Sequence, residues 1–104
     1  MPWYFYVLQV IGGMLVTNGI PHWVQGLSGA PFQSPFARPP GVGESSPLIN
    51  AYWGLANVIG GGVLIARFAS GDALGWICLC AGAVVLSTQA SHHFGKVRAA
   101  RATS

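Results

Sequence analysis

The sequence predicts an all-α integral membrane protein with three transmembrane helices and a long ordered loop, rich in proline and glycine, between the first and second helices. The first observation is that only 7% of the 104 residues are charged, whereas soluble domains carry about 25%. The second is that residues 3–20, 48–66 and 73–90 contain no charged side chain, and each stretch approaches the roughly 20 residues that cross a bilayer. The third is that residues 21–47 hold every proline except Pro2. We therefore expect one membrane domain with three spans, a loop over 21–47 and a basic tail over 91–104.

The residues at the ends of these stretches support the division. Pro2 fits the first turn of a helix, and Pro21 is expected to stop the first helix after Asn18 and Gly19. Ser46 and Pro47 predict an N-cap and first helical residue. Asp72 would cap the third helix. A cleaved signal peptide is rejected because the first residues contain no lysine or arginine.

Positive charge predicts the orientation. Three passes place the loop and the tail on one side of the membrane. That side would carry four basic residues, Arg38, Lys96, Arg98 and Arg101, against Arg67 alone on the other. Cytoplasmic flanks usually hold the excess of lysine and arginine. We expect the N-terminus outside, with the loop and the C-terminus in the cytoplasm.

Small residues predict close helix packing. In lipid, small side chains let helix backbones approach one another. The candidates are Gly54, Ala56, Gly60, Gly61, Gly75 and Gly82. Ala56 and Gly60 are four residues apart, whereas Gly54/Gly61 and Gly75/Gly82 are seven apart. We expect part of this surface to face other membrane subunits or a second copy, the alternative being packing within one chain.

Uncharged polar side chains occur within or beside the predicted spans. They are Gln9, Asn18, Asn50, Asn57 and Gln89. Amides in hydrocarbon need partners, so these either hold the helices together or line a polar path that opens toward the loop.

Three histidines lie near one predicted interface. His22 follows the first span, and His92 and His93 follow the third. Imidazole can ligate metals and haem, but the spacing matches no ligand signature, and these are weak cofactor candidates. We expect no metal, no cofactor and no catalytic residues, since nucleophile motifs are missing and the chain's one Asp and one Glu would lie on opposite sides of the membrane.

The aromatic residues of the loop predict order rather than a flexible linker. Trp23, Phe32 and Phe36 can anchor the segment at the interface, and flexible linkers lack such side chains. We expect an ordered cap over the helix ends and a docking surface.

Part of the chain resembles a group of small, uncharacterised bacterial multi-span membrane proteins. The resemblance covers roughly residues 18–57. The matching residues are the segments 18–22 (NGIPH), 25–29 (QGLSG), 34–37 (SPFA), 39–41 (PPG) and 45–47 (SSP), together with Asn50, Trp53 and Gly54. It implies a bacterial inner-membrane protein and no activity.

Together these observations predict a non-enzymatic membrane protein, an accessory subunit of a larger complex or a homo-oligomer. The alternatives are a small oligomeric channel or transporter lined by Asn and Gln, and a histidine-ligated metal or haem protein. Membrane lipid is an expected partner, because the basic tail attracts anionic headgroups. Nucleic acid is not expected.

Overall fold

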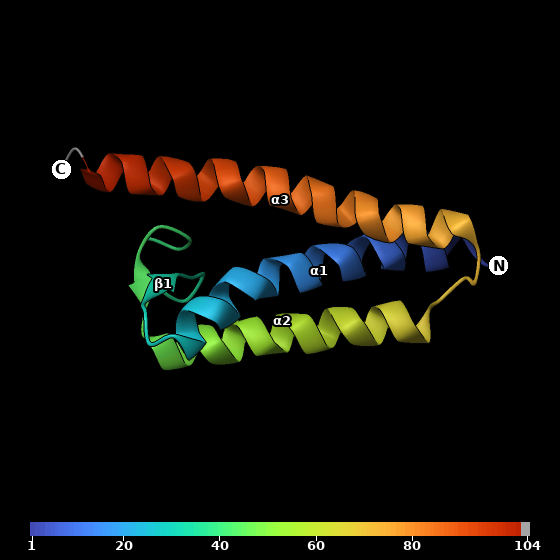
Figure 1. The fold of residues 1–104 in the computed structure, drawn as a ribbon, viewed down its shortest axis with the longest axis horizontal. Coiled ribbons are helices and arrows are strands. Elements are labelled where there is room, and N and C mark those ends of the chain that lie inside the picture. The colour runs from blue at the N-terminus through green and yellow to red at the C-terminus, as the bar shows by residue number, and fades with distance from the viewer. Residues whose placement is uncertain (103–104) are drawn as a thin grey trace.

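A computed structural model describes residues 1–102, which form helices and one short β-hairpin (Figure 1). The helices are α1 (Trp3–Leu27), α2 (Pro47–Arg67) and α3 (Ala73–Ala102), and the strands are β1 (Phe32–Gln33) and β2 (Glu44–Ser45). The molecule is elongated, with extents of 50 × 24 × 20 Å.

Helix α1 lies between the other two helices and contacts both, whereas α2 and α3 meet chiefly through it (Figure 1). The N-terminus and the turn at residues 68–72 lie at one end of the molecule, and the loop and the end of α3 lie at the other. We call these the turn end and the loop end.

Glycines bring the helices together. A Cβ atom on Gly19 of α1 would lie 2.6 Å from the carbonyl oxygen of Gly54, and one on Gly61 of α2 would lie 2.8 Å from the carbonyl oxygen of Gly12. On the other side of α1, a Cβ on Gly82 of α3 would overlap the carbonyl of Val10. Helix backbones therefore touch at these positions, as small residues permit.

The interior is polar and the surface apolar. Among residues 1–102, the buried hydrophobic side chains are Phe32 and Val97. The buried polar side chains are Gln9, His22, Gln33, Ser34, Ser45, Asn50 and Asn57. Large apolar side chains on all three helices are exposed, such as Val7, Val63 and Val84.

The expectation of three membrane spans is wrong. Of the helices in residues 1–102, only α2 and α3 are long and apolar enough to cross a membrane, judged by length and composition. Helix α1 falls short because its apolar sequence is interrupted by polar residues, among them Gln9, Asn18 and His22, which it turns toward the interior.

The predicted loop boundaries also need correction. Helix α1 continues through Pro21 to Leu27, so the loop covers residues 28–46 rather than 21–47. Proline costs a helix about 3 kcal/mol, but the turns after Pro21 pack on α2, where Gly26 approaches the backbone of Ala51. The predicted tail is likewise helical up to Ala102; its last two residues lie outside the described part.

The helix starts predicted from Ser46, Pro47 and Asp72 are confirmed. Ser46 accepts a hydrogen bond from the Ile49 amide at 3.3 Å with Pro47 following it, and Asp72 accepts one from the Gly75 amide at 2.9 Å.

The loop is ordered by its own hydrogen bonds. β1 and β2 pair antiparallel, with Phe32 opposite Ser45. Ser34 binds the segment between them, because its carbonyl accepts from the Gly41 amide at 2.9 Å and its hydroxyl contacts that of Ser45. Gly41 has a φ of 74°, a conformation that favours glycine.

Candidate functional site

Asn50, the first fully buried side chain of α2, joins the loop to the helices. Its amide nitrogen donates to the carbonyl oxygens of Phe32 (3.0 Å), Ser45 (3.1 Å) and Ser46 (3.2 Å). Its amide oxygen lies 2.9 Å from Nδ1 of His22. Because two N–H groups serve three carbonyls, one hydrogen is shared. One side chain therefore ties both strands and α1 to the start of α2.

His22 is held in one tautomer by this contact. An amide oxygen only accepts, so Nδ1 of His22 donates, and the neutral ring carries its lone pair on Nε2. The ring is 3% exposed and meets Phe32 and Phe94 edge-on at centroid distances of 5.2 and 6.2 Å. Burial lowers the pKa of His22, opposed by the hydrogen bond to Asn50. Its partner is an amide rather than a hydroxyl or thiol, so the pair builds no activated nucleophile.

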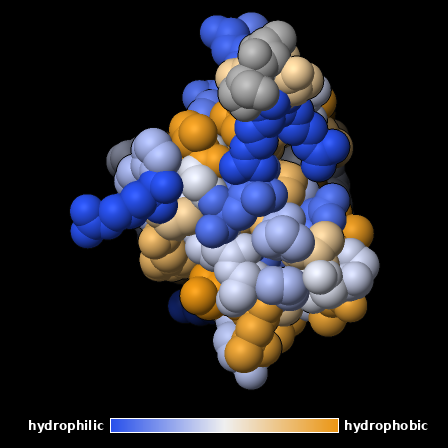
Figure 2. Space-filling view, turned by 90° about the vertical axis from the view of Figure 1, so that its left-hand side faces the viewer, coloured by the Kyte–Doolittle hydropathy of each residue, from blue (hydrophilic) through white to orange (hydrophobic). Residues whose placement is uncertain are grey.

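The end of α3 holds the loop from the opposite side. Nε2 of His93 donates to the Gly41 carbonyl at 2.8 Å. Arg101 donates to the Val42 carbonyl at 2.9 Å and forms an ion pair with Glu44 at 3.0 Å. Figure 2 shows this end of the molecule, where hydrophilic side chains gather over the loop and the end of α3. We call the contacts of His22, Asn50, His93 and Arg101 with the loop the loop clasp.

The three histidines do not assemble into a metal site. His22 is buried against Asn50, His93 binds the loop backbone and His92 is exposed. Within residues 1–102, no group of three or more His, Cys, Asp or Glu side chains could hold a metal ion.

The remaining predicted amides occupy different environments. Asn18 donates to the side-chain oxygen of Asn57 at 3.3 Å, and Asn57 donates to the Trp53 carbonyl at 2.8 Å, which joins α1 to α2. Gln89 is exposed on α3. These side chains do not form one continuous polar path.

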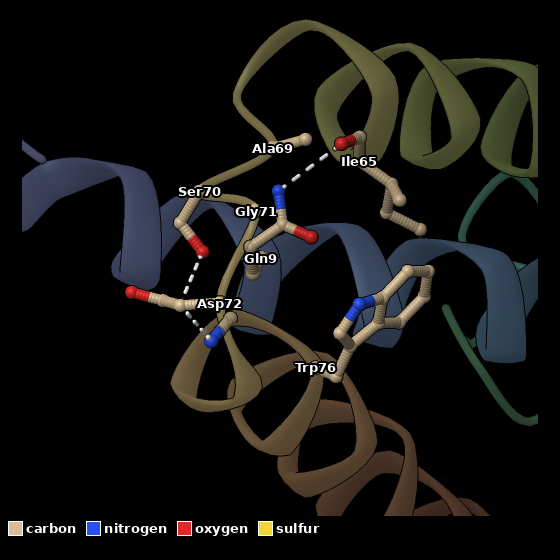
Figure 3. A pocket seen from close by; sticks show the side chains of 8 residues that line it. Gln9, Ile65, Ala69, Ser70, Gly71, Asp72 and Trp76 are labelled. Carbon is tan, nitrogen blue, oxygen red and sulfur yellow. Dashed lines mark hydrogen bonds between the residues drawn. The ribbon is translucent and has the colours of Figure 1, made fainter.

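Gln9 lies at the turn end of the molecule. Its amide nitrogen donates to the carbonyls of Ile65 (3.2 Å) and Phe68 (2.9 Å), which satisfies the last turn of α2. It lines a cavity of about 70 Å³ together with Asp72 and Trp76, and Figure 3 shows its amide reaching from α1 to the Ile65 carbonyl.

Hydrogen bonds to Asp72, the strongest from Tyr6 at 2.6 Å, lower the pKa of Asp72 to about 2.

The predicted packing residues divide into two groups. Gly54, Gly61 and Gly82 lie against the backbone of a neighbouring helix, and Gly75 lies against the Ser70 side chain. Gly60 has open space around it and Ala56 is exposed.

The aromatic residues predicted to dock a partner are divided as well. Phe32 is 6% exposed and packs on Phe94 at a centroid distance of 4.9 Å, so it is part of the core. Trp23 is half-buried against α2. Phe36 is exposed and stands edge-on to Trp53 at 5.1 Å.

Sequence reasoning missed Ser34, Gln33, Phe94 and the Arg101–Glu44 ion pair. The one available signal was opposite charge, since Glu44 is the loop's only acid and the tail is basic. Residues 91–104 are predicted as a basic tail beside the membrane, and only a helix that extends past Ala90 brings Arg101 to the loop.

No family model matches the chain, and neither a curated protein nor a solved structure matches it.

Proposed function

We propose that this chain is a non-enzymatic membrane protein in which α2 and α3 cross the bilayer and present apolar faces to lipid and to other subunits. The observation that carries the proposal is the inverted distribution of side chains. Gln9, His22, Asn50 and Asn57 are at most 5% exposed, whereas Trp76, Ile77 and Val84 are at least 61% exposed. Water would oppose such an arrangement, and hydrocarbon favours it.

The exposure of α2 and α3 distinguishes them from the core helices of a soluble protein. A core helix of that kind is mostly buried. In the 18-residue apolar stretches of α2 and α3, only 22% and 11% of the residues are buried. A protein of this size without a membrane would leave an apolar surface far larger than soluble monomers tolerate.

Charge supports an orientation of α2 and α3 in which the loop end lies in the cytoplasm and the turn at residues 68–72 lies outside. The loop end holds Arg38, Lys96, Arg98 and Arg101, and Arg67 lies beside the turn. The positive-inside tendency favours this arrangement. The resemblance of residues 18–57 to bacterial membrane proteins makes the bacterial inner membrane the proposed location.

The proposed role is that of an accessory subunit or a homo-oligomer. The polar side chains that could serve a substrate, Asn18, His22, Asn50 and Asn57, are hydrogen-bonded within the chain. Gly60 of α2 has open space around it and instead leaves room for another helix.

Two measurements test this proposal. Alkaline extraction and vesicle flotation should leave the protein with the membrane, and recovery in the soluble fraction would refute its membrane location. Native mass spectrometry in mild detergent should then show a species heavier than the 10.9 kDa chain. A monodisperse monomer without partner would refute the subunit role.

A further inference from the structure

An apolar groove lies on the outer face of α2 at the loop end. Its lining residues are Phe36, Ile49, Tyr52, Trp53 and Ala56, and its volume is about 490 Å³, within the roughly 300–1,000 Å³ of small-molecule sites. Phe36, which comes from the loop, stands perpendicular to Trp53 in the lining of the groove. Tyr52 is 65% exposed beside it.

A hollow that contains Arg38 adjoins the groove at Phe36. Residues 35–40 line this hollow, which shares Phe36 with the groove and contains Arg38. Within residues 1–102, Glu44 is the carboxylate that forms an ion pair, and its partner is Arg101, so Arg38 faces no carboxylate.

The backbone that carries Arg38 is fixed. The Pro39 carbonyl accepts from the amides of Val42 (3.0 Å) and Gly43 (2.8 Å), and a Cβ on Gly43 would overlap the Arg38 carbonyl. The loop clasp holds the same segment to α3 at Gly41 and Val42. The backbone from which the Arg38 side chain extends is therefore held next to an apolar surface.

We propose that the groove and Arg38 together bind one anionic phospholipid, with an acyl chain along Tyr52, Trp53 and Ala56 and the phosphate at Arg38. This inference rests on the proposed membrane location. The charge lies at the end of a candidate span, where headgroups lie, and the apolar residues run from it along the helix. Arginine is suited to phosphate because its guanidinium offers paired donors.

Charge argues for lipid rather than a second copy in this groove. The chain has a net charge of +3, and Arg38, Lys96 and Arg98 all belong to the loop end. A second copy inserted in the same orientation would bring like charges together at Arg38, whereas an anionic lipid neutralises them.

The test is native mass spectrometry of the full chain in neutral, lipid-free detergent, titrated with phosphatidylglycerol or with phosphatidylcholine of the same acyl chains. We expect about five-fold tighter binding of phosphatidylglycerol to the wild type. Arg38→Gln should abolish this preference. Arg98→Gln is the matched control and should retain it, because Arg98 lies on α3 and is not among the residues that line the groove or the hollow. Ala56→Trp, which fills the groove, should weaken binding of both lipids.

Equal effects of Arg38→Gln and Arg98→Gln would overturn the inference, as would equal affinity of the wild type for the two lipids. A dimer that forms through this face and excludes lipid would also overturn it. Circular dichroism of each variant confirms that the helices are intact. A chain that inserts into vesicles but shows no lipid preference disproves this site alone, whereas a chain that stays in solution disproves the membrane location.

Discussion

At the residue scale, Asn50 is the side chain on which the loop end depends most. It is 0% exposed and is bound to three backbone carbonyls and to His22. Asn50→Leu would remove the side-chain partner of His22 and of the Phe32 and Ser45 carbonyls, at about 1–3 kcal/mol for each, whereas the Ser46 carbonyl keeps the backbone amide of residue 50. We expect a total loss of about 3–5 kcal/mol in the free energy of unfolding, measured by chemical or thermal denaturation in detergent. Gln89→Leu makes the same chemical change at an exposed position and should cost no stability; equal losses in the two variants would contradict the role of Asn50.

His22 gives the loop end a dependence on pH. Burial lowers the pKa of His22 in the folded chain below its ordinary value of 6.5, so the unfolded chain binds the proton more readily. The stability should therefore be full above pH 6.5 and fall as the pH drops below it, by up to about 1.4 kcal/mol per unit. The unfolding temperature, compared at pH 7.5 and pH 5.5, measures this loss. His22→Gln should flatten the profile, and an unchanged pH dependence in that variant would rule out His22 as its source.

At the element scale, three consecutive glycines of α2 test the helix packing. Gly61 faces α1, where a Cβ would meet the Gly12 carbonyl, whereas Gly60 and Gly62 have open space around them. Gly61→Ala should cost about 1–3 kcal/mol of stability through overpacking. Gly60→Ala and Gly62→Ala should instead gain about 0.5–1 kcal/mol from helix propensity. Thermal unfolding of the three variants decides between these outcomes. The gain at Gly60 is the expectation for the isolated chain, and a loss there in the assembled protein would support the proposed packing of another helix at that position.

The elements also show how much the sequence could predict. Ser46 and Asp72 marked the starts of α2 and α3 correctly, since capping is a local interaction between a side chain and nearby amides. Pro21 led to a wrong prediction for the end of α1. The helix continues past this proline because its last turns pack on α2, and the local sequence gives no sign of that contact. The tail was misjudged for a similar reason: α3 continues past Ala90, and Arg101 reaches the loop only in three dimensions.

The sequence indicates which residues belong to the candidate site better than it indicates how these residues are arranged. His22 and Asn50 stood out as polar residues near an interface, but their pairing depends on the contact of α1 with α2. Ser34 carried no signal, because a serine before a proline is common in loops. Its role depends on the strand pairing that brings it to Ser45.

At the scale of the whole molecule, polar side chains are buried between the helices and apolar side chains are exposed along them. Helix α1 contributes polar groups and glycines to the centre, and α2 and α3 carry the apolar surface outward. In the proposed membrane location, such a molecule would fold around hydrogen bonds and close backbone contacts, with the bilayer acting as the apolar solvent. The loop clasp holds the loop to the helices at the loop end. Hydrogen bonds of Gln9 and Asp72 hold the turn to the helices at the other end.

Spin labelling in lipid nanodiscs tests this claim most directly. Single nitroxides are placed at position 63 of α2, position 84 of α3 and position 71 of the turn, with Cys78 and Cys80 replaced by alanine. Val63 and Val84 are 57% and 64% exposed. We predict that the labels at 63 and 84 collide preferentially with oxygen, which concentrates in hydrocarbon, and that the label at 71 collides preferentially with a water-soluble nickel chelate. Preference for the nickel chelate at all three positions would contradict the proposed contact of α2 and α3 with lipid.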